Sequence, residues 1–152
     1  MAKFKVLLVD DEEDFVKALA ERLQMRDLGP DVALSGEEAL QSIGTEIPDV
    51  MVLDLRMPGI DGMEVLRRVK KAYPEVQVII LTGHGSEKDE EEARRLGAFE
   101  YLQKPVNIDH LVKVLKDAYK AKIERHGAAI AFAEEGMYST AKDIMDEDKK
   151  KH

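Results

Sequence analysis

Short runs rich in Val, Ile and Leu alternate with longer stretches of helical periodicity, and this alternation restricts the fold more than any other feature of the sequence. Continuous apolar runs of about four to eight residues are typical of strands buried on both faces, whereas apolar residues at three- and four-residue spacing indicate one-sided helices. The predicted strands are residues 4–9, 31–34, 50–53, 76–81 and 99–102. The predicted helices are residues 12–25, 36–43, 63–72, 88–96 and 108–123.

Five strand–helix pairs in strict alternation predict an α/β fold, a doubly wound five-stranded parallel sheet with helices on both faces. The common flavodoxin-like strand order for five strands is 2-1-3-4-5. Ligands of such folds bind beyond the carboxyl ends of the strands where the winding reverses, here between the first and third strands. The first strand ends at Asp10 and Asp11 and the third at Asp54, so the fold brings three carboxylates together.

The three carboxylates require a positive partner, because two of them about 4 Å apart repel by about 4 kcal/mol at an effective dielectric near 20. The chain has no cysteine and no histidines at metal-ligand spacing, so an all-oxygen site favours Mg²⁺ or Mn²⁺. Thr82 ends the fourth strand and Lys104 follows the fifth. A hydroxyl and an ammonium beside a metal–carboxylate site match the charge of a transferred phosphoryl group.

Composition excludes several other classes of function. The formal net charge is -8, and there is no basic patch apart from Lys149, Lys150 and Lys151, which argues against a nucleic-acid-binding face. The sequence shows neither a signal segment nor an apolar run near the roughly 20 residues of a membrane helix. We therefore expect a cytoplasmic protein with no membrane contact.

Four stretches, LLVDD, VLDLRMPGIDG, IILTGHGS and GAFEYLQKP, resemble in order and spacing the receiver domain of two-component response regulators. The resemblance covers residues 3 to about 123. It implies a signalling switch rather than an enzyme, one that catalyses only its own phosphorylation and dephosphorylation. Such a domain takes a phosphoryl group from a histidine kinase in a Mg²⁺-dependent reaction and then alters its contact with a downstream protein.

The resemblance assigns roles to the acidic residues. Asp54 is implied to be the phosphoacceptor. Asp11 and Asp54 are implied to bind Mg²⁺ directly, together with the backbone carbonyl of Arg56, while Asp10 acts largely through water. Glu12, Glu13 and Asp14 fall in the first turn of the following helix, where their charge complements the helix dipole at the rim of the site.

The remaining roles concern the phosphoryl group and the switch. Lys104 is implied to pair with the phosphoryl group, and Thr82 to donate a hydrogen bond to it. Tyr101 matches the switch aromatic of the family and is expected to follow Thr82 inward. The resemblance implies that partner proteins recognise the change on the face formed by the fourth helix, fifth strand and fifth helix. The same face is a candidate surface for a homodimer. The family further implies a cis bond between Lys104 and Pro105.

Three loop residues are given supporting roles. Arg56 and His84 stand two residues after the acceptor and two after the threonine, and we hypothesise that they set the dephosphorylation rate by obstructing or orienting the attacking water. Gly83 keeps the phosphoryl approach open and offers its backbone N–H. The acidic run 87–92 is interpreted as a solvated helix start that would disfavour acidic partners.

Two alternative functions share these motifs. The chain could be a phosphorelay intermediate that passes its phosphoryl group to a histidine phosphotransfer protein. A metal-dependent phosphatase is a further alternative, but it would want a general-acid carboxylate just after the nucleophile, where Arg56 stands.

The strand–helix alternation ends near residue 123, which divides the chain into a receiver domain, 1–123, and a helical extension, 124–152, with no recognised output domain. Short helices are predicted over 128–135 and 139–146 of the extension. Helix-start signals are clearer in the first part: Ser35 with Glu38 fits a capping box, and Ser86 and Asn107 are candidate caps.

Overall fold

The computed structural model describes residues 4–126. The strands are β1 (Val6–Val9), β2 (Asp31–Ala33), β3 (Val50–Leu53), β4 (Gln77–Thr82) and β5 (Glu100–Gln103). The helices are α1 (Glu13–Gln24), α2 (Gly36–Thr45), α3 (Gly62–Ala72), α4 (Glu87–Arg95) and α5 (Ile108–His126). Each element predicted within residues 4–126 is present, and its ends differ from the prediction by at most three residues. The helices predicted over 128–135 and 139–146 lie outside the described residues, and the division at residue 123 stays a prediction.

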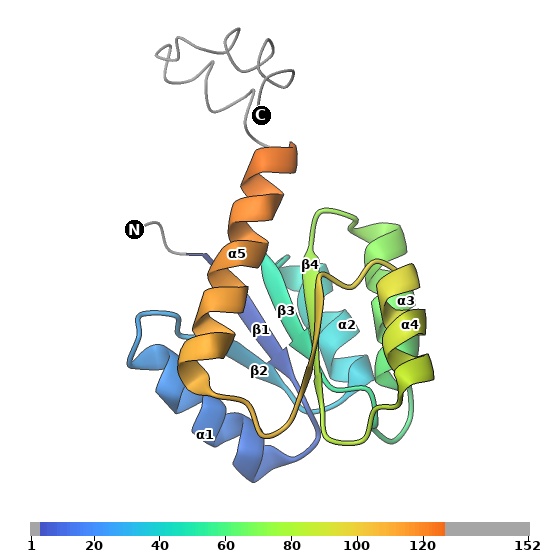
Figure 1. Cartoon of the computed structure of the whole chain (residues 1–152), viewed down its shortest axis with the longest axis horizontal. Coiled ribbons are helices and arrows are strands. Elements are labelled where there is room, and N and C mark those ends of the chain that lie inside the picture. Colours follow the sequence, from blue (N-terminus) through green and yellow to red (C-terminus); the bar gives the residue numbers. More distant parts are fainter. Residues whose placement is uncertain (1–3, 127–152) are drawn as a thin grey trace, which may run out of the picture. The chain divides into compact units, whose positions relative to one another are not determined.

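The five strands form one parallel sheet in the order β2-β1-β3-β4-β5, which confirms the predicted topology (Figure 1). Every residue of β1, β3 and β4 is buried, as their continuous apolar runs predicted. In the central ladder Val9 pairs with Leu53, the last residue of β1 with the last of β3. Consequently the residues that follow these two strands emerge side by side at the carboxyl edge of the sheet.

The helices cover the sheet in two layers (Figure 1). On one face α1 and α5 pack against alternate strand residues such as Leu8 and Val52. On the other face α2, α3 and α4 pack against the intervening residues, such as Val9 and Leu53. The alternation follows from the two-residue period of a strand, and it leaves only the strand ends free to carry polar chemistry. Within residues 4–126 no helix is long and apolar enough to cross a membrane.

Side chains at the helix starts confirm most of the predicted caps. Ser86 and Asp89 form a reciprocal capping box at α4, and the Asn107 side chain accepts the amides of Asp109 and His110 at α5. Ser35 caps α2 by accepting the amide of Glu38 at 3.0 Å. The predicted box at this helix is incomplete, because the Glu38 carboxylate accepts the amide of Leu34 instead of that of Ser35.

Candidate functional site

Backbone hydrogen bonds between neighbouring strands hold the three central site residues in place. The amide of Asp10 donates to the carbonyl of Ala33 at 3.1 Å, and the amide of Asp54 donates to that of Val9 at 3.0 Å. The amide of Lys104 donates to the carbonyl of Thr82 at 3.0 Å. Each of these bonds continues the hydrogen bonding of the sheet by one residue. The charged side chains of Asp10, Asp54 and Lys104 therefore lie directly at the carboxyl ends of the strands.

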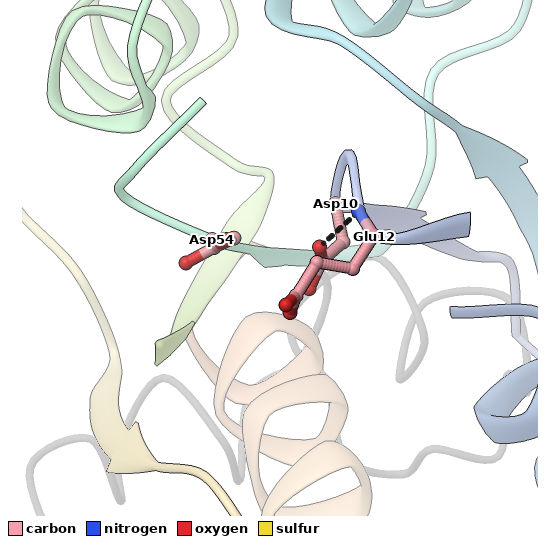
Figure 2. A group of neighbouring side chains, drawn as sticks. All are labelled: Asp10, Glu12 and Asp54. Atoms are coloured by element: carbon pink, nitrogen blue, oxygen red, sulfur yellow. Dashed lines mark hydrogen bonds between the residues drawn. The ribbon is translucent and has the colours of Figure 1, made fainter. Parts of the chain in front are cut away.

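Three carboxylates converge at this edge. One oxygen each of Asp10, Glu12 and Asp54 lies within 4.8 Å of the others. Figure 2 shows Asp10 and Glu12 on the segment that follows β1, with the Glu12 amide donating to Asp10 Oδ1 at 2.8 Å, and Asp54 on the adjacent strand. Asp10 and Asp54 are buried, each 4% exposed, whereas Glu12 is exposed. The convergence of Asp10 and Asp54 follows the strand order, as predicted.

Lys104 is the counter-ion of this cluster. Its Nζ lies 2.7 Å from Asp10 Oδ2, 2.6 Å from Glu12 Oε1 and 3.8 Å from Asp54 Oδ2. The same ammonium stands 4.3 Å from the centroid of the Phe15 ring, a cation–π contact. Its side chain is only 13% exposed. One ammonium is therefore shared among three carboxylates in a largely desolvated place.

The electrostatic balance shows in the pKa values. Burial raises the pKa of Asp10, and the hydrogen bonds from Lys104 and from the Glu12 amide oppose that rise. The hydrogen bond from Lys104 lowers the pKa of Glu12. Although burial by itself would lower the pKa of Lys104, its bonds to Asp10 and Glu12 and the charge of Asp54 raise it. Lys104 therefore stays protonated, and three carboxyl groups share its single positive charge.

The cluster fits a divalent cation. Asp54 Oδ1 is buried without a hydrogen-bond partner among the described residues, and a buried carboxylate oxygen left unpaired is unfavourable by about 1–3 kcal/mol or more. Three carboxylates and one lysine leave the site short of positive charge. Oxygen donors of this kind suit Mg²⁺, which binds through one or two carboxylates and keeps several waters. An acidic site for a divalent ion is therefore consistent with the residues present.

Asp11 is not one of the three converging carboxylates, and the Arg56 side chain forms its ion pair with a residue outside the cluster. The Asp11 side chain is exposed, and it is Glu12, one residue further on, that meets Asp10 and Asp54. The Arg56 guanidinium turns toward α4, where it pairs with Asp89 at 2.8 Å. The roles of Asp11 and of the Arg56 carbonyl as metal ligands stay predictions.

The β4 side of the edge carries the predicted hydroxyl. Thr82 is fully buried, and its Oγ1 accepts the amide of His84 at 3.3 Å. Gly83 lies beside Lys104, since a Cβ built on it would be 3.7 Å from Lys104 Cδ. His84 is exposed on the loop that follows β4.

Tyr101 is buried in the middle of β5, 7% exposed, and its hydroxyl has no hydrogen-bond partner among the described residues. Burial raises its pKa, and the charges of Asp89 and Glu90 add to the rise. The peptide bond between Lys104 and Pro105 is cis, as the resemblance implied.

Sequence reasoning missed two contacts of this region. Glu12 was assigned to the first helical turn, but it is the residue before α1, caps nothing with its side chain, and reaches Lys104 instead. Asp89 was interpreted as part of a solvated acidic run, but it is half-buried and pairs with Arg56. The Ser-x-x-Asp spacing from Ser86 to Asp89 was a usable signal for the cap, though not for the ion pair.

Comparison with known proteins identifies the family. The model of the response regulator receiver domain matches residues 6–116. A putative NtrX-like response regulator of Rickettsia typhi is 38% identical over 120 residues, which cover 78% of this chain and 25% of that protein. The transcriptional regulatory protein GlrR of Escherichia coli is 40% identical over 113 residues, 74% of this chain and 26% of that protein. The matched region of this chain therefore corresponds to about a quarter of the length of each of these relatives.

Solved structures show the same fold. A response regulator receiver domain protein from Clostridium thermocellum matches with a TM-score of 0.73 and 36% identity, covering 78% of this chain and 95% of that one. A CheY-like receiver domain protein from Methanospirillum hungatei matches with a TM-score of 0.78 and 24% identity, covering 82% and 99%. With its strand order, its acidic edge and these matches, the chain belongs to the response regulator receiver domain family, whose members are signalling switches of two-component systems rather than enzymes.

Proposed function

We propose that Asp54 accepts a phosphoryl group from a phosphohistidine of a histidine kinase and that the resulting charge alters a protein–protein contact. The observation that carries this proposal is the buried, unpaired Oδ1 of Asp54 at the carboxyl end of β3. The other oxygen of the same carboxylate, Oδ2, lies 3.8 Å from the Lys104 ammonium. A carboxylate is a weak nucleophile, so a site that uses one must position it and neutralise the charge that gathers around it.

The transfer replaces one bond to phosphorus with another. An oxygen of Asp54 attacks the phosphorus of the phosphohistidine, a P–O bond forms, and the P–N bond breaks. The leaving nitrogen keeps the electron pair and takes a proton from solvent. We propose that Lys104, whose ammonium lies 3.8 Å from Asp54 Oδ2, pairs with the phosphoryl oxygens and that the hydroxyl of the buried Thr82 donates a hydrogen bond to them.

A bound Mg²⁺ or Mn²⁺ would neutralise charge on the carboxylates and on the transferred group. Asp10, Asp11 and Asp54, with the carbonyl of Arg56, are the ligand set we propose from the family motif. To this set we add Glu12 as a neighbouring negative charge, because its carboxylate lies within 4.8 Å of those of Asp10 and Asp54.

Phosphorylation adds about 1.5 to 2 negative charges to an edge that already lacks positive charge. Lys104 would then be drawn from Asp10 and Glu12 toward the new oxygens, and Thr82 would turn its hydroxyl to them. We propose that Tyr101 and α4 respond to this rearrangement and that a downstream protein recognises the face of α4, β5 and α5.

The test is incubation with acetyl phosphate and Mg²⁺ followed by intact mass measurement. The wild type should gain the mass of one phosphoryl group, and Asp54→Ala should gain none. Asp31→Asn, which alters an exposed carboxylate of β2, is the control and should behave as wild type. Chelation of the divalent ion should prevent the gain in all of them. A wild type that stays unmodified, or an Asp54→Ala protein that is modified at a comparable rate, contradicts the proposal.

A further inference from the structure

We propose that Gly85 is a positioning residue for Tyr101: the missing side chain at residue 85 leaves the slot that the tyrosine hydroxyl occupies, so the unphosphorylated chain already holds its switch tyrosine inward. Only the consequence for signalling rests on the proposed function. The placement of the ring is a property of the unmodified protein.

Steric contact carries the inference. A Cβ built on Gly85 would overlap the Tyr101 hydroxyl and would lie 2.8 Å from Tyr101 Cζ and 2.9 Å from Thr82 Cγ2. Carbon atoms that are not bonded pack at about 3.5–4.0 Å, so alanine at residue 85 cannot coexist with this position of the ring. The easiest relief is rotation of the ring, because the hydroxyl is the far end of a side chain with two rotatable bonds.

Backbone conformation does not account for this glycine. Among the described glycines only Gly59 and Gly97 have positive φ, at 77° and 106°. Gly85 has a φ that other residues adopt readily, so its special property is the absence of a side chain. A substitution at Gly85 therefore tests whether the space beside Tyr101 is needed, and not whether the backbone needs a glycine.

The slot holds the ring through packing alone. Tyr101 belongs to the apolar cluster on the α2, α3 and α4 face, while its hydroxyl is buried without a partner among the described residues. An unpaired buried hydroxyl is unfavourable, and burial raises the pKa of this phenol. The inward position is thus stabilised by the ring and opposed by the oxygen, which leaves the balance sensitive to one methyl group at residue 85.

The slot also links Tyr101 to Thr82, because both side chains border the space above Gly85. A larger residue at 85 would move the tyrosine outward and leave Thr82 without this neighbour. The resting position of the switch is then determined by residue 85, independently of the phosphoryl group.

The experiment measures exposure of the Tyr101 ring in unphosphorylated protein. Tyrosine is isotopically labelled, the Tyr101 resonance is assigned with Tyr101→Phe, and a soluble paramagnetic relaxation agent reports solvent contact. In the wild type the Tyr101 ring should be shielded, and in Gly85→Ala its relaxation enhancement should rise severalfold. Gly83→Ala is the matched control, since its Cβ would meet Lys104 at an ordinary 3.7 Å and should leave Tyr101 shielded. An exposed ring in the wild type, or a shielded ring in folded Gly85→Ala, overturns the proposal.

A second measurement covers the case in which Gly85→Ala does not fold. Gly85→Ala is introduced into Tyr101→Ala protein, where the overlap with the ring is removed and only the contact of the new methyl group with Thr82 Cγ2 at 2.9 Å remains. Urea denaturation should show a smaller loss of stability from Gly85→Ala in this background than in the wild type, and a Gly85→Ala protein that is unfolded alone should fold again in the double variant. Equal losses in both backgrounds contradict the proposal. Failure of the wild type to gain a phosphoryl mass would remove the proposed function and leave these results unaffected.

Discussion

The carboxyl edge of the sheet contains two unsatisfied oxygens of opposite character. Asp54 Oδ1, at the end of β3, is a carboxylate oxygen in a cluster of charged groups, whereas Tyr101 Oη is the hydroxyl of a ring that belongs to an apolar cluster. They are the two buried side-chain oxygens or nitrogens without a hydrogen-bond partner in the part of the chain that the structure describes.

The difference between the two regions lies in how each oxygen can be satisfied. The Asp54 side chain is short and fixed at the end of a buried strand, so the acidic cluster gains stability by receiving a cation or a positive group. The Tyr101 side chain is long and can rotate, so its hydroxyl reaches water by leaving the slot. The acidic cluster is therefore the region that can take up a cation, and the surroundings of Tyr101 are the region in which a side chain can change its position.

The largest effect on the charged region is expected from Lys104→Met. In metal-free buffer this change should lower the free energy of unfolding by about 2 kcal/mol, because Asp10 and Asp54 are buried and lose their shared counter-ion. Urea denaturation with a chelator present measures it. Lys17→Met, which removes an exposed pair with Glu13, is the control and should leave stability nearly unchanged. Equal effects of the two changes would show that the acidic edge is not short of positive charge.

Glu12→Gln should weaken Mg²⁺ binding by about fivefold, equivalent to about 1 kcal/mol, because it removes one of three neighbouring negative charges from an exposed position. Calorimetric titration at constant ionic strength gives the affinity. Glu13→Gln serves as the control, since that carboxylate faces Lys17 instead of the cluster. Asp11→Asn in the same series compares the ligand proposed from the motif with the carboxylate found in the cluster. Unchanged affinity in Glu12→Gln would separate Glu12 from the cation site.

Tyr101→Phe should raise the free energy of unfolding by about 1 kcal/mol, because the unpaired buried hydroxyl is removed and the ring stays. Thermal or urea denaturation measures the gain, and Tyr73→Phe, at a partly exposed position, should give none. A loss of stability in Tyr101→Phe would mean that the hydroxyl is paired in solution.

The same phenol gives the chain a pH dependence at high pH. Burial raises the pKa of Tyr101 above the ordinary 10.0, so its contribution to stability is fully present below pH 10.0 and is lost as pH rises through the folded value. Ultraviolet absorbance titration should show one tyrosine that ionises later than the others in wild type, and that delay should be absent in Gly85→Ala. A wild type without a delayed tyrosine would argue against the buried position.

The smallest effect on stability is expected at the link between the two regions. Arg56→Ala breaks the pair with Asp89, in which Arg56 is 56% exposed, and should change the free energy of unfolding by less than about 0.5 kcal/mol. The decay rate of the phosphorylated protein should nevertheless change in Arg56→Ala or in His84→Ala, since the two side chains are hypothesised to obstruct or orient the attacking water. Decay rates equal to wild type in both variants would refute that hypothesis.

The fold and the positions of Asp10, Asp54 and Lys104 at the carboxyl edge of the sheet could be predicted because they depend on local sequence patterns. Runs such as those of β1 and β3 are apolar at every position, and such short runs, alternating with helical stretches, are typical of strands buried on both faces. Once the strands are parallel and ordered, Asp10 and Asp54 have to meet. Lys104 follows by the same logic from the end of β5.

The contacts that could not be predicted join residues far apart in sequence or depend on the space left by a neighbour. Glu12 and Lys104 are 92 positions apart, and their contact requires that Glu12 turn back from α1 rather than cap it. Arg56 reaches Asp89 across 33 positions, and its long side chain has many other rotamers open to it.

What the sequence by itself determined is where each polar group leaves the sheet, because strand burial and strand order follow from the period of the apolar residues. What only the tertiary structure decided is which groups then meet: Glu12 with Lys104, Arg56 with Asp89, and the Tyr101 hydroxyl with the space beside Gly85. The physical reason is that a side chain selects its rotamer from the volume and charge its neighbours leave, and those neighbours are assembled only when the chain has folded.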